Sequence, residues 1–363
     1  MIDLPRLSRW CFALAASCCL LTCQPPDPAP RNVPLEEIAG TPAIREYMAG
    51  FTSRGIQSDS SVLPAPEATR ASLRVPDELT VDLLLAEPRV NQPVELNFDH
   101  RGRLWVVQYQ QYPYPEGVKV AAIDHHSRVR YDRTPGPPGS GRRGADKITV
   151  FTDTDGDGTY DVASDAVTGL NITTGVEWGR RKLWVLTPPY LVAYPDPDGN
   201  GLPDGPAEVH LSGFGLEDTH AVANSLRWGP DGWLYGAQGS TTTAALVSAV
   251  GDTVRFRGQG IWRYHPEKKI CELFAEGGGN TFDVEFDAKG RLYSGDNGVT
   301  CGFYYKQGGY YRKNWGKHGP LTNPYAFGYL PGMEVDGKRM RFTHAWIRYE
   351  GGALPDAYAG KVR

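Results

Sequence analysis

The chain has 363 residues, a formal net charge of −4 and a sequence pI near 6.1. This balance provides no basic surface for nucleic acid or anionic lipid, so small molecules or neutral surfaces are the expected partners. Glycine (43 residues) and proline (29 residues) are abundant, which favours an all-β fold rich in turns.

The N-terminal residues predict export. The apolar run Trp10–Thr22 follows two arginines and is too short to span a bilayer as a helix, which is typical of a secretory signal peptide. The sequence LLTC at Leu20–Cys23 resembles a bacterial lipobox. We therefore expect residues 1–22 to be removed and Cys23 to carry lipid, giving an exported, membrane-anchored lipoprotein on the periplasmic or outer envelope face. Cleavage without lipid is the alternative.

Residues 23–71 form the next predicted segment, a Pro-rich tether with a short helical pattern near Leu35 to Phe51. The globular domain is expected over residues 72–363. Beyond Cys23 and the leader, this chain contains only Cys271 and Cys301, which an oxidising compartment could pair. The sequence does not show whether they come close enough to do so.

One phrase recurs four times within the predicted domain. Each copy is a short strand with alternating apolar residues, a turn containing glycine, and a second strand that begins Leu-Trp or Leu-Tyr. The copies are LNFDHRGRLWVVQ (Leu96–Gln108), VEWGRRKLWVLT (Val176–Thr187), LRWGPDGWLYGAQ (Leu226–Gln238) and VEFDAKGRLYSGD (Val284–Asp296).

The spacing of these copies predicts a β-propeller. The repeated leucines Leu104, Leu183, Leu234 and Leu292 lie 79, 51 and 58 residues apart, close to the roughly 40 to 50 residues of one four-stranded blade plus loops. The long first interval contains a Pro-, Gly- and Arg-rich stretch that we interpret as an insertion. A β-sandwich is the alternative, but sandwich strands do not repeat a whole phrase at blade spacing.

Two loops rich in carboxylates follow apolar strands one blade apart. The first contains Asp153, Asp155, Asp157 and Asp161, and the second contains Asp196, Asp198, Asn200 and Asp204. Oxygen ligands at alternate positions with a glycine at the sixth are what Ca²⁺ requires of a short loop. The alternative is a hairpin turn, because Asp-Gly and Asn-Gly favour turns without a cation. A bound ion would be structural, since the turns are peripheral.

The phrase DTHAVANSLRWGPDGWLYGAQGS (Asp218–Ser240) resembles the base-bearing blade of the quinoprotein glucose/sorbosone dehydrogenases. Together with LLLAEPRVNQPVELNFDHRGRLWVV and GGYYRKNWGKHGPLTNPYAFGY, it resembles the large membrane-bound dehydrogenase family of planctomycete-type bacteria. The resemblance covers roughly residues 72–363, and three motifs in the same order make it fairly specific.

The resemblance implies a six-bladed propeller that oxidises a sugar or alcohol with pyrroloquinoline quinone and calcium. His220 would be the general base, because a histidine pKa lies near working pH, and Asp218 would orient its ring. The expected cofactor-binding residues, at inner strand ends, are Gln238, Asn280, Asp296 and Asn297.

Two departures from the quinoprotein pattern leave the function open. The quinoproteins place their histidine where this chain has Ala221, and their cofactor-binding arginine where it has Gly279. Loss of that arginine removes a bidentate partner for a carboxylate. A non-catalytic carbohydrate-binding or scaffold lipoprotein is therefore the alternative to a dehydrogenase, and a calcium-dependent hydrolase is a third possibility. The cationic motif RKNWGKHGP, from Arg312, could hold a ligand or be a solvated loop.

The four phrases account for about four of the six expected blades, and at most five blades are expected in this chain. The closing residues FTHAWIRYEGGALPDAYAGKVR resemble the family segment that leads into a further blade. We therefore expect the propeller to be incomplete here, with exposed sheet edges, and an electron acceptor to lie in a missing C-terminal region.

Overall fold

The computed structural model describes residues 33–50, 64–296, 301–313, 328–334, 345 and 347–361. The predicted leader and Cys23 lie outside these ranges. Within the described residues, no helix is both long enough and apolar enough to cross a membrane. The structure thus leaves the lipid anchor as a prediction.

Three short helices precede the sheets: α1 (Leu35–Ile38), α2 (Pro42–Ala49) and α3 (Pro66–Ser72). The predicted helical segment is therefore two helices rather than one. Thr41 separates them and caps α2, because its hydroxyl oxygen accepts a hydrogen bond from the backbone N–H of Ile44 at 3.2 Å.

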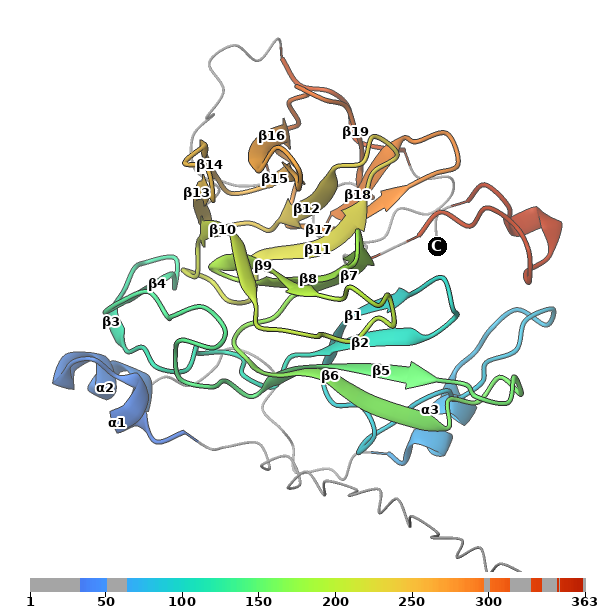
Figure 1. Ribbon diagram of the computed structural model, residues 1–363, viewed down its shortest axis with the longest axis horizontal. Coiled ribbons are helices and arrows are strands. Elements are labelled where there is room, and N and C mark those ends of the chain that lie inside the picture. Colours follow the sequence, from blue (N-terminus) through green and yellow to red (C-terminus); the bar gives the residue numbers. More distant parts are fainter. Residues whose placement is uncertain are drawn as a thin grey trace, which may run out of the picture. The chain divides into compact units, whose positions relative to one another are not determined.

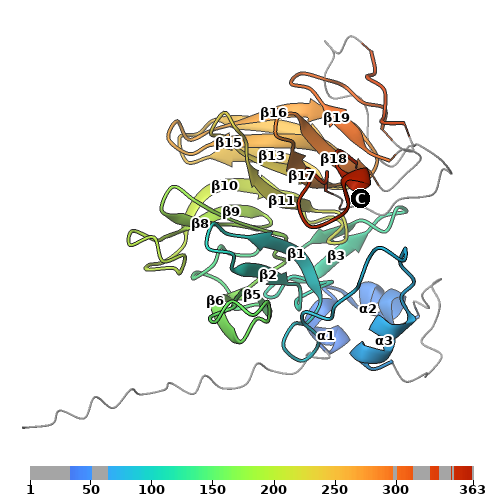
Figure 2. The same cartoon turned by 90° about the vertical axis from the view of Figure 1, so that its right-hand side faces the viewer.

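Four antiparallel sheets then follow one another along the chain (Figures 1 and 2). The first contains β1 (Pro93–Phe98), β2 (Leu104–Gln108), β5 (Asp146–Thr152) and β6 (Val162–Leu170). The second contains β7 (Gly175–Gly179), β8 (Lys182–Thr187), β9 (Tyr190–Pro195) and β10 (Glu208–Phe214), extended by β13 (Thr243–Ser248) and β14 (Thr253–Arg257). The third contains β11 (Ala223–Trp228), β12 (Leu234–Gln238), β15 (Gly260–His265) and β16 (Ile270–Glu276), and the fourth β17 (Thr281–Phe286), β18 (Leu292–Asp296) and β19 (Phe303–Tyr305).

This arrangement confirms the predicted all-β propeller. Each recurring phrase forms the first two strands of one sheet, and the first strands β1, β7, β11 and β17 pack side by side. Side chains link neighbouring first strands: Thr174 donates to the carbonyl of Ala223 at 2.6 Å, and the Asn224 amide donates to that of Thr281 at 3.1 Å. Four successive sheets are described, and the number of blades remains a prediction.

The ends of the strands lie along two opposite sides of these sheets, and we call these two sides edges. We call the edge where β2, β8, β12 and β18 end, and where β5, β9 and β15 begin, the Gln238 edge. The opposite edge, where β5 and β9 end in the two carboxylate loops, is the Asp196 edge. Loops at these two edges are separated by the length of a strand, so they form distinct sites.

The predicted insertion lies between β2 and β5. It contains a separate hairpin, β3 (Val120–Ile123) and β4 (Val129–Tyr131). Figure 1 shows this hairpin beside α1 and α2, and the backbone N–H of Gly40 donates to the carbonyl of Val120 at 2.8 Å. The insertion is therefore held in place from the N-terminal side.

Apolar side chains fill the spaces between neighbouring sheets. Trp105 and Val185 belong to the cluster between the first and second sheets, and Trp184 and Trp262 to the cluster between the second and third.

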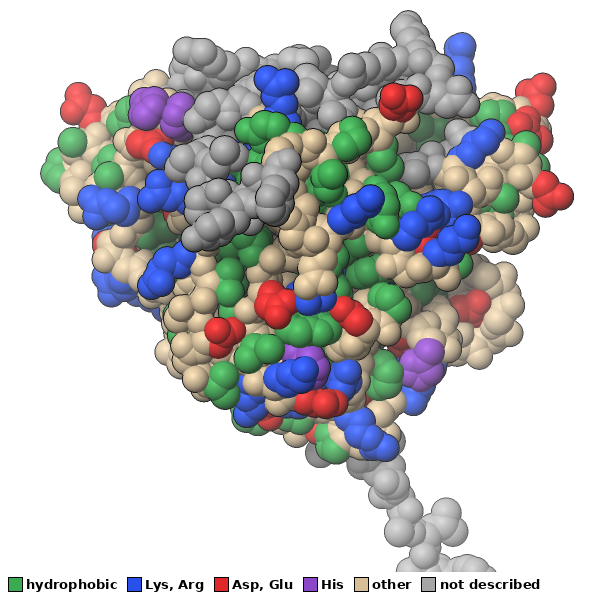
Figure 3. All heavy atoms as spheres, turned by 90° about the horizontal axis from the view of Figure 1, so that it is seen from above, with side chains coloured by type: hydrophobic (Ala, Val, Ile, Leu, Met, Phe, Trp, Pro, Cys, Tyr) green, Lys and Arg blue, Asp and Glu red, His purple; other side chains and the backbone are tan. Residues whose placement is uncertain are grey.

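On the side of β1 away from the second sheet, Val94, Leu96 and Phe98 are 49%, 57% and 66% exposed. On the face shown in Figure 3, acidic and basic side chains are interspersed rather than gathered by sign.

Charged side chains meet between the innermost strands. The guanidinium of Arg227 donates to Asn97 Oδ1 and Glu285 Oε1, each at 2.7 Å, and lies 3.8 Å from Glu177 Oε2. Burial raises the pKa of Glu177 to about 7, and although Arg227 opposes this, nearby Glu285 adds to it. Burial likewise raises the pKa of Glu95 well above its usual value.

Because of this cluster, we expect the free energy of unfolding to fall as the pH rises. The pKa of Glu177 is 4.5 in the unfolded chain and about 7 in the folded protein, so between these pH values only the folded protein keeps the proton. The stability that this proton contributes is complete below pH 4.5 and is lost as the pH rises through 7. From pH 5.5 to 8 the wild type should lose roughly 2 kcal/mol more than a Glu177→Gln variant. Urea unfolding at both pH values measures this difference, and equal losses would contradict it.

Candidate functional site

Four of the predicted site residues meet at the Gln238 edge around one loop, Gly239–Thr242, which follows β12. They are Asp218, His220, Gln238 and Asn280. The hydroxyl of Thr241 donates to Asp218 Oδ2 at 2.6 Å. The backbone N–H of Ser240 donates to Asn280 Oδ1, also at 2.6 Å. The loop follows β12. Its hydrogen bonds therefore connect the end of this strand to Asp218, which precedes β11, and to Asn280, which precedes β17.

His220 is exposed in the turn before β11. Asp218 does not hold its ring as the sequence predicted: Asp218 Oδ1 accepts from the backbone N–H of His220 at 3.1 Å. The nearest described partner of the imidazole is Tyr112, whose hydroxyl lies 3.5 Å from Nδ1. Ala221, the position that aligns with the quinoprotein histidine, is buried, and its carbonyl accepts from the Thr242 hydroxyl at 2.9 Å.

Several buried polar atoms beneath this loop have no hydrogen-bond partner among the described residues. They are Gln238 Oε1, both side-chain polar atoms of Gln259, and Thr281 Oγ1, and all three residues are 0% exposed. Gln238 still donates from Nε2 to the carbonyls of Thr242 and Gly258 at 3.1 and 3.3 Å. An unsatisfied buried polar group costs about 1–3 kcal/mol, so these atoms call for water or a polar ligand.

A cavity of about 580 Å³ opens beside the same loop. One wall consists of Thr241–Thr243 and Arg257–Gly258, and the other is the β3–β4 hairpin of the insertion, including Asp124, His125 and His126. Glu217 lies between the two walls: its carboxylate accepts from the Thr243 hydroxyl, and its carbonyl accepts from the Val129 backbone N–H at 2.6 Å. The insertion therefore helps to form the candidate site.

The cavity contains cationic groups that could hold an anion. Arg128 pairs with Asp124 at 2.8 Å. Arg130 and Arg257, both exposed on its lining, have no ion-pair partner in the described part of the chain. Lys313, from the predicted cationic motif, donates to the Arg257 carbonyl at 2.7 Å, and burial lowers its pKa. Arg312 is exposed, and residues 314–320 of that motif lie outside the described residues.

Asp146, which the sequence analysis missed, is fully buried where β5 begins. Its carboxylate accepts from the backbone N–H groups of Gln111 and Thr173 at 2.5 and 2.6 Å. Burial outweighs these bonds and raises the pKa of Asp146 to about 7. Its sequence context is that of any polar residue before a strand, so no sequence signal indicated this environment.

The remaining predicted cofactor residues are only partly described. The backbone of Asp296 pairs with Thr281 at the Gln238 edge, but its side chain and the whole of Asn297 lie outside the described residues. Neither cysteine of the predicted domain forms a disulfide, and burial raises the pKa of the Cys271 thiol to about 12. The pairing that an oxidising compartment would allow is therefore not formed.

The two carboxylate loops lie at the Asp196 edge, away from His220. One carboxylate oxygen from each of Asp153, Asp155 and Asp157 lies within 4.8 Å of the others, and the same holds for Asp196, Asp198 and Asp204. In the first loop, Asp161 instead accepts from the backbone N–H of Thr154 at 3.0 Å. In the second, Asn200 donates to Asp198 Oδ2 at 2.9 Å. A cation in either loop would therefore not touch a ligand at the Gln238 edge.

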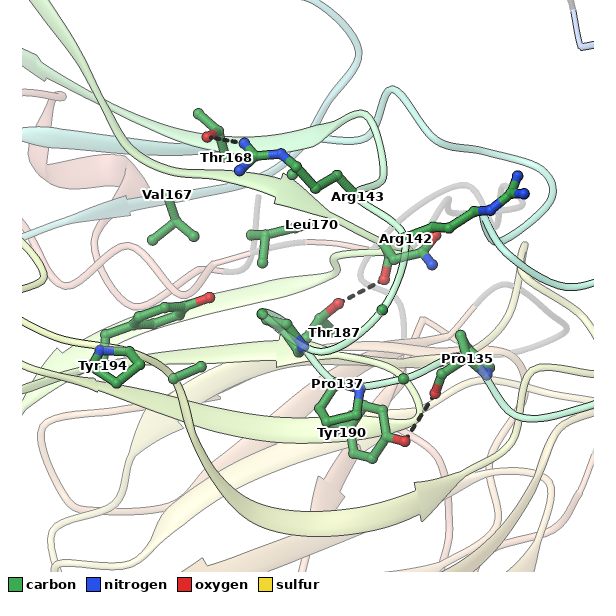
Figure 4. A pocket seen from close by; sticks show the side chains of 18 of the residues that line it. Pro135, Pro137, Arg142, Arg143, Val167, Thr168, Leu170, Thr187, Tyr190 and Tyr194 are labelled. Atoms are coloured by element: carbon green, nitrogen blue, oxygen red, sulfur yellow. Dashed lines mark hydrogen bonds between the residues drawn. The ribbon is translucent and has the colours of Figure 1, made fainter.

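A second cavity, of about 440 Å³, lies between the insertion and β6 and β9 (Figure 4). Tyr190 donates to the Pro135 carbonyl and Arg143 donates to Thr168, each at 2.9 Å, while the guanidinium of Arg142 points away. Neither a carboxylate nor an imidazole lines this cavity, so it lacks a general base. We therefore place the candidate site at the first cavity, beside the Gly239–Thr242 loop of the Gln238 edge.

Comparison with known proteins gives one family and several distant structures. The sequence family described as a domain of unknown function (DUF7133) matches residues 65–350. No curated protein matches the sequence. Among solved structures, virginiamycin B lyase from Staphylococcus aureus is 12% identical with a TM-score of 0.28, over 58% of this chain and 65% of that one. A streptogramin B lyase structure is also 12% identical with a TM-score of 0.27, over 57% and 63%. The chain thus spans less than two thirds of either structure, and the likeness concerns the fold alone.

Proposed function

We propose that this chain, which belongs to the DUF7133 family, oxidises a small sugar or alcohol at the Gln238 edge of its propeller. The observation that carries the proposal is the set of buried, unpartnered polar atoms of Gln238, Gln259 and Thr281 beneath the loop that joins Asp218 and Asn280. Such atoms are costly unless a polar molecule meets them. A general-base candidate and a cationic cavity border the same loop.

The residues of this edge fit pyrroloquinoline quinone, the cofactor that the sequence resemblance implies. The guanidinium groups of Arg130 and Arg257 suit its carboxylates, and the unpartnered side-chain N–H of Gln259 could donate to a carbonyl oxygen. When bound, the quinone would supply the hydride acceptor. We propose calcium as a partner of the protein as well, but at the other edge of the sheets.

His220 would accept the hydroxyl proton of the substrate. Its ring is exposed, so a substrate could reach it, and Tyr112 stands beside Nδ1. Asp218 acts on the main chain: by accepting from the His220 N–H and the Thr241 hydroxyl, it fixes the turn that carries the ring. Asp218 is therefore a positioning residue rather than a catalytic one.

The alternative, sugar binding without oxidation, is favoured by one specific observation. Tyr112 and His220 are both exposed, with ring centroids 6.3 Å apart, and no carboxylate among the described residues holds the imidazole. Exposed aromatic rings of this kind can stack on a sugar. The same edge would then bind a carbohydrate and transfer no electrons.

A dye-reduction assay separates the two functions. Purified protein is supplied with pyrroloquinoline quinone and calcium, and reduction of an artificial acceptor dye is followed with a panel of sugars and primary alcohols. We expect turnover with at least one of them that requires the quinone. Saturable binding of a sugar, measured by calorimetry, with no dye reduction would support the binding function instead.

A further inference from the structure

One carboxylate at the Asp196 edge is buried yet only half satisfied. Asp196 is 0% exposed, and its Oδ2 accepts from the indole N–H of Trp178 at 2.6 Å and from the backbone N–H of Gly201 at 2.9 Å. Its other oxygen, Oδ1, is buried and has no partner among the described residues. A buried carboxylate oxygen without a partner costs more than a neutral group in the same position.

Two further carboxylates lie beside Asp196. One oxygen from each of Asp196, Asp198 and Asp204 lies within 4.8 Å of the others, and Asp198 and Asp204 are exposed. Three carboxylates so close together repel one another unless a cation neutralises them. We infer that the loop from Asp196 to Asp204 binds a divalent cation of the calcium class, which takes oxygen ligands from carboxylates, backbone carbonyls and water.

The first carboxylate loop, from Asp153 to Asp161, differs from the second in how its carboxylate oxygens are hydrogen-bonded. Both oxygens of Asp153 accept backbone N–H groups, from Gly156 at 2.7 Å and Gly158 at 2.9 Å. Asp157 likewise accepts from the N–H of Thr159 at 2.7 Å. These bonds belong to the turn, and no carboxylate oxygen of this loop is both buried and unpartnered. A hairpin turn accounts for the first loop, whereas it leaves Asp196 Oδ1 unexplained.

The acids at the thirteenth position of both loops are engaged elsewhere. Asp165 pairs with Lys147 at 3.3 Å. Glu208 pairs with Lys182 and lies 3.6 Å from the imidazole of His210. The cation in the second loop is therefore held by Asp196, Asp198 and Asp204, with water completing the shell.

The cation would join the first and second sheets. The loop presents the carbonyls of Gly199 and Asn200 to the β1–β2 turn, where they accept from Arg101 at 2.6 Å and Arg103 at 2.8 Å. A cation between the carboxylates fixes the loop in the form that presents these carbonyls. Its role is structural, at the far ends of the strands from His220, and it does not depend on the proposed oxidation.

Terbium luminescence tests this site without any activity measurement. Tb³⁺ replaces Ca²⁺ at oxygen sites, and the indole of Trp178, bonded to Asp196, can sensitise its emission. Excitation of tryptophan should give a saturable terbium signal that calcium displaces, with half-saturation by calcium at or below about 10⁻⁴–10⁻³ M, the range of extracellular calcium modules. The Tm should rise on adding calcium to chelator-treated protein.

Matched asparagine substitutions locate the ion. Asp196→Asn keeps an oxygen that can accept from Trp178 and Gly201, and it should lose most of the terbium signal and the calcium-dependent rise in Tm. Asp153→Asn should retain both. If Asp196→Asn does not fold, the exposed Asp198→Asn and Asp204→Asn variants carry the test with the same expected loss. No saturable signal in the wild type, or a signal that survives these changes or depends on Asp153, would overturn the inference.

Discussion

Replacing His220 by glutamine is expected to lower kcat by roughly a hundredfold or more, the low end of the ~10²–10⁴ range for a positioned general base. The ring is exposed, and among the described residues its side-chain partner is Tyr112, whose hydroxyl lies 3.5 Å from Nδ1, so its loss should move the Tm little. Steady-state kinetics with the substrate found by dye reduction, together with thermal unfolding of the same preparation, measure both quantities.

Two further variants serve as controls for His220. His100→Gln changes an exposed histidine that lies against Trp178, 4.9 Å between ring centroids, in the β1–β2 turn, and it should leave kcat unchanged. Tyr112→Phe removes only the hydroxyl beside Nδ1 and should shift the pH profile of kcat while preserving most activity. If His220→Gln retains full activity, or loses it only in proportion to folded protein, the general base lies elsewhere.

Replacing Arg227 by methionine is expected to destabilise the protein by about 1–3 kcal/mol, the typical cost of leaving a desolvated polar group without its partner. The guanidinium bonds Glu285 and Asn97 and lies near Glu177, so its removal leaves partly buried carboxylates without their cation. The loss should shrink toward pH 5, because carboxyls with raised pKa values then take up protons. Urea unfolding at pH 8 and pH 5 measures the effect.

The control for this prediction is a pair on the surface. Arg133 bonds its neighbour Asp132 at 2.7 Å, but its side chain is 67% exposed, so Arg133→Met should cost under about 1 kcal/mol. The double variant Arg227→Met/Glu285→Gln should recover part of the stability lost in the single variant. Similar small losses in Arg227→Met and Arg133→Met would show that the central charge cluster contributes little.

The fold could be predicted largely because its repeated unit is local. In LNFDHRGRLWVVQ and its three counterparts, apolar alternation, a glycine turn and a Leu-Trp or Leu-Tyr start fall within 12 or 13 residues, and all four form adjacent antiparallel strands. The two carboxylate loops were predicted about one blade apart, each after an apolar strand, and the structure places each of them after the third strand of a sheet. Hydrophobic period and turn chemistry determine these features.

The sequence grouped residues that the structure brings together, but it did not predict their contacts. The phrase around Asp218 and Gln238 marked residues that meet around one loop, yet the sequence did not show that Asp218 bonds the backbone of His220 rather than its ring. It also gave no sign that the insertion forms a cavity wall, or that Asp196 would be buried while Asp153 is not. These features depend on contacts between residues far apart in the chain, which local patterns do not encode.

If an anionic quinone binds at the Gln238 edge, equilibrium titration with pyrroloquinoline quinone should reveal it through a change in tryptophan fluorescence. The wild type should bind one equivalent saturably, Arg130→Gln/Arg257→Gln should weaken binding at least tenfold, and Arg143→Gln, in the second cavity, should not change it. Absence of saturable binding, or binding that depends on Arg143 and not on Arg130 and Arg257, would show that the quinone does not bind at the Gln238 edge.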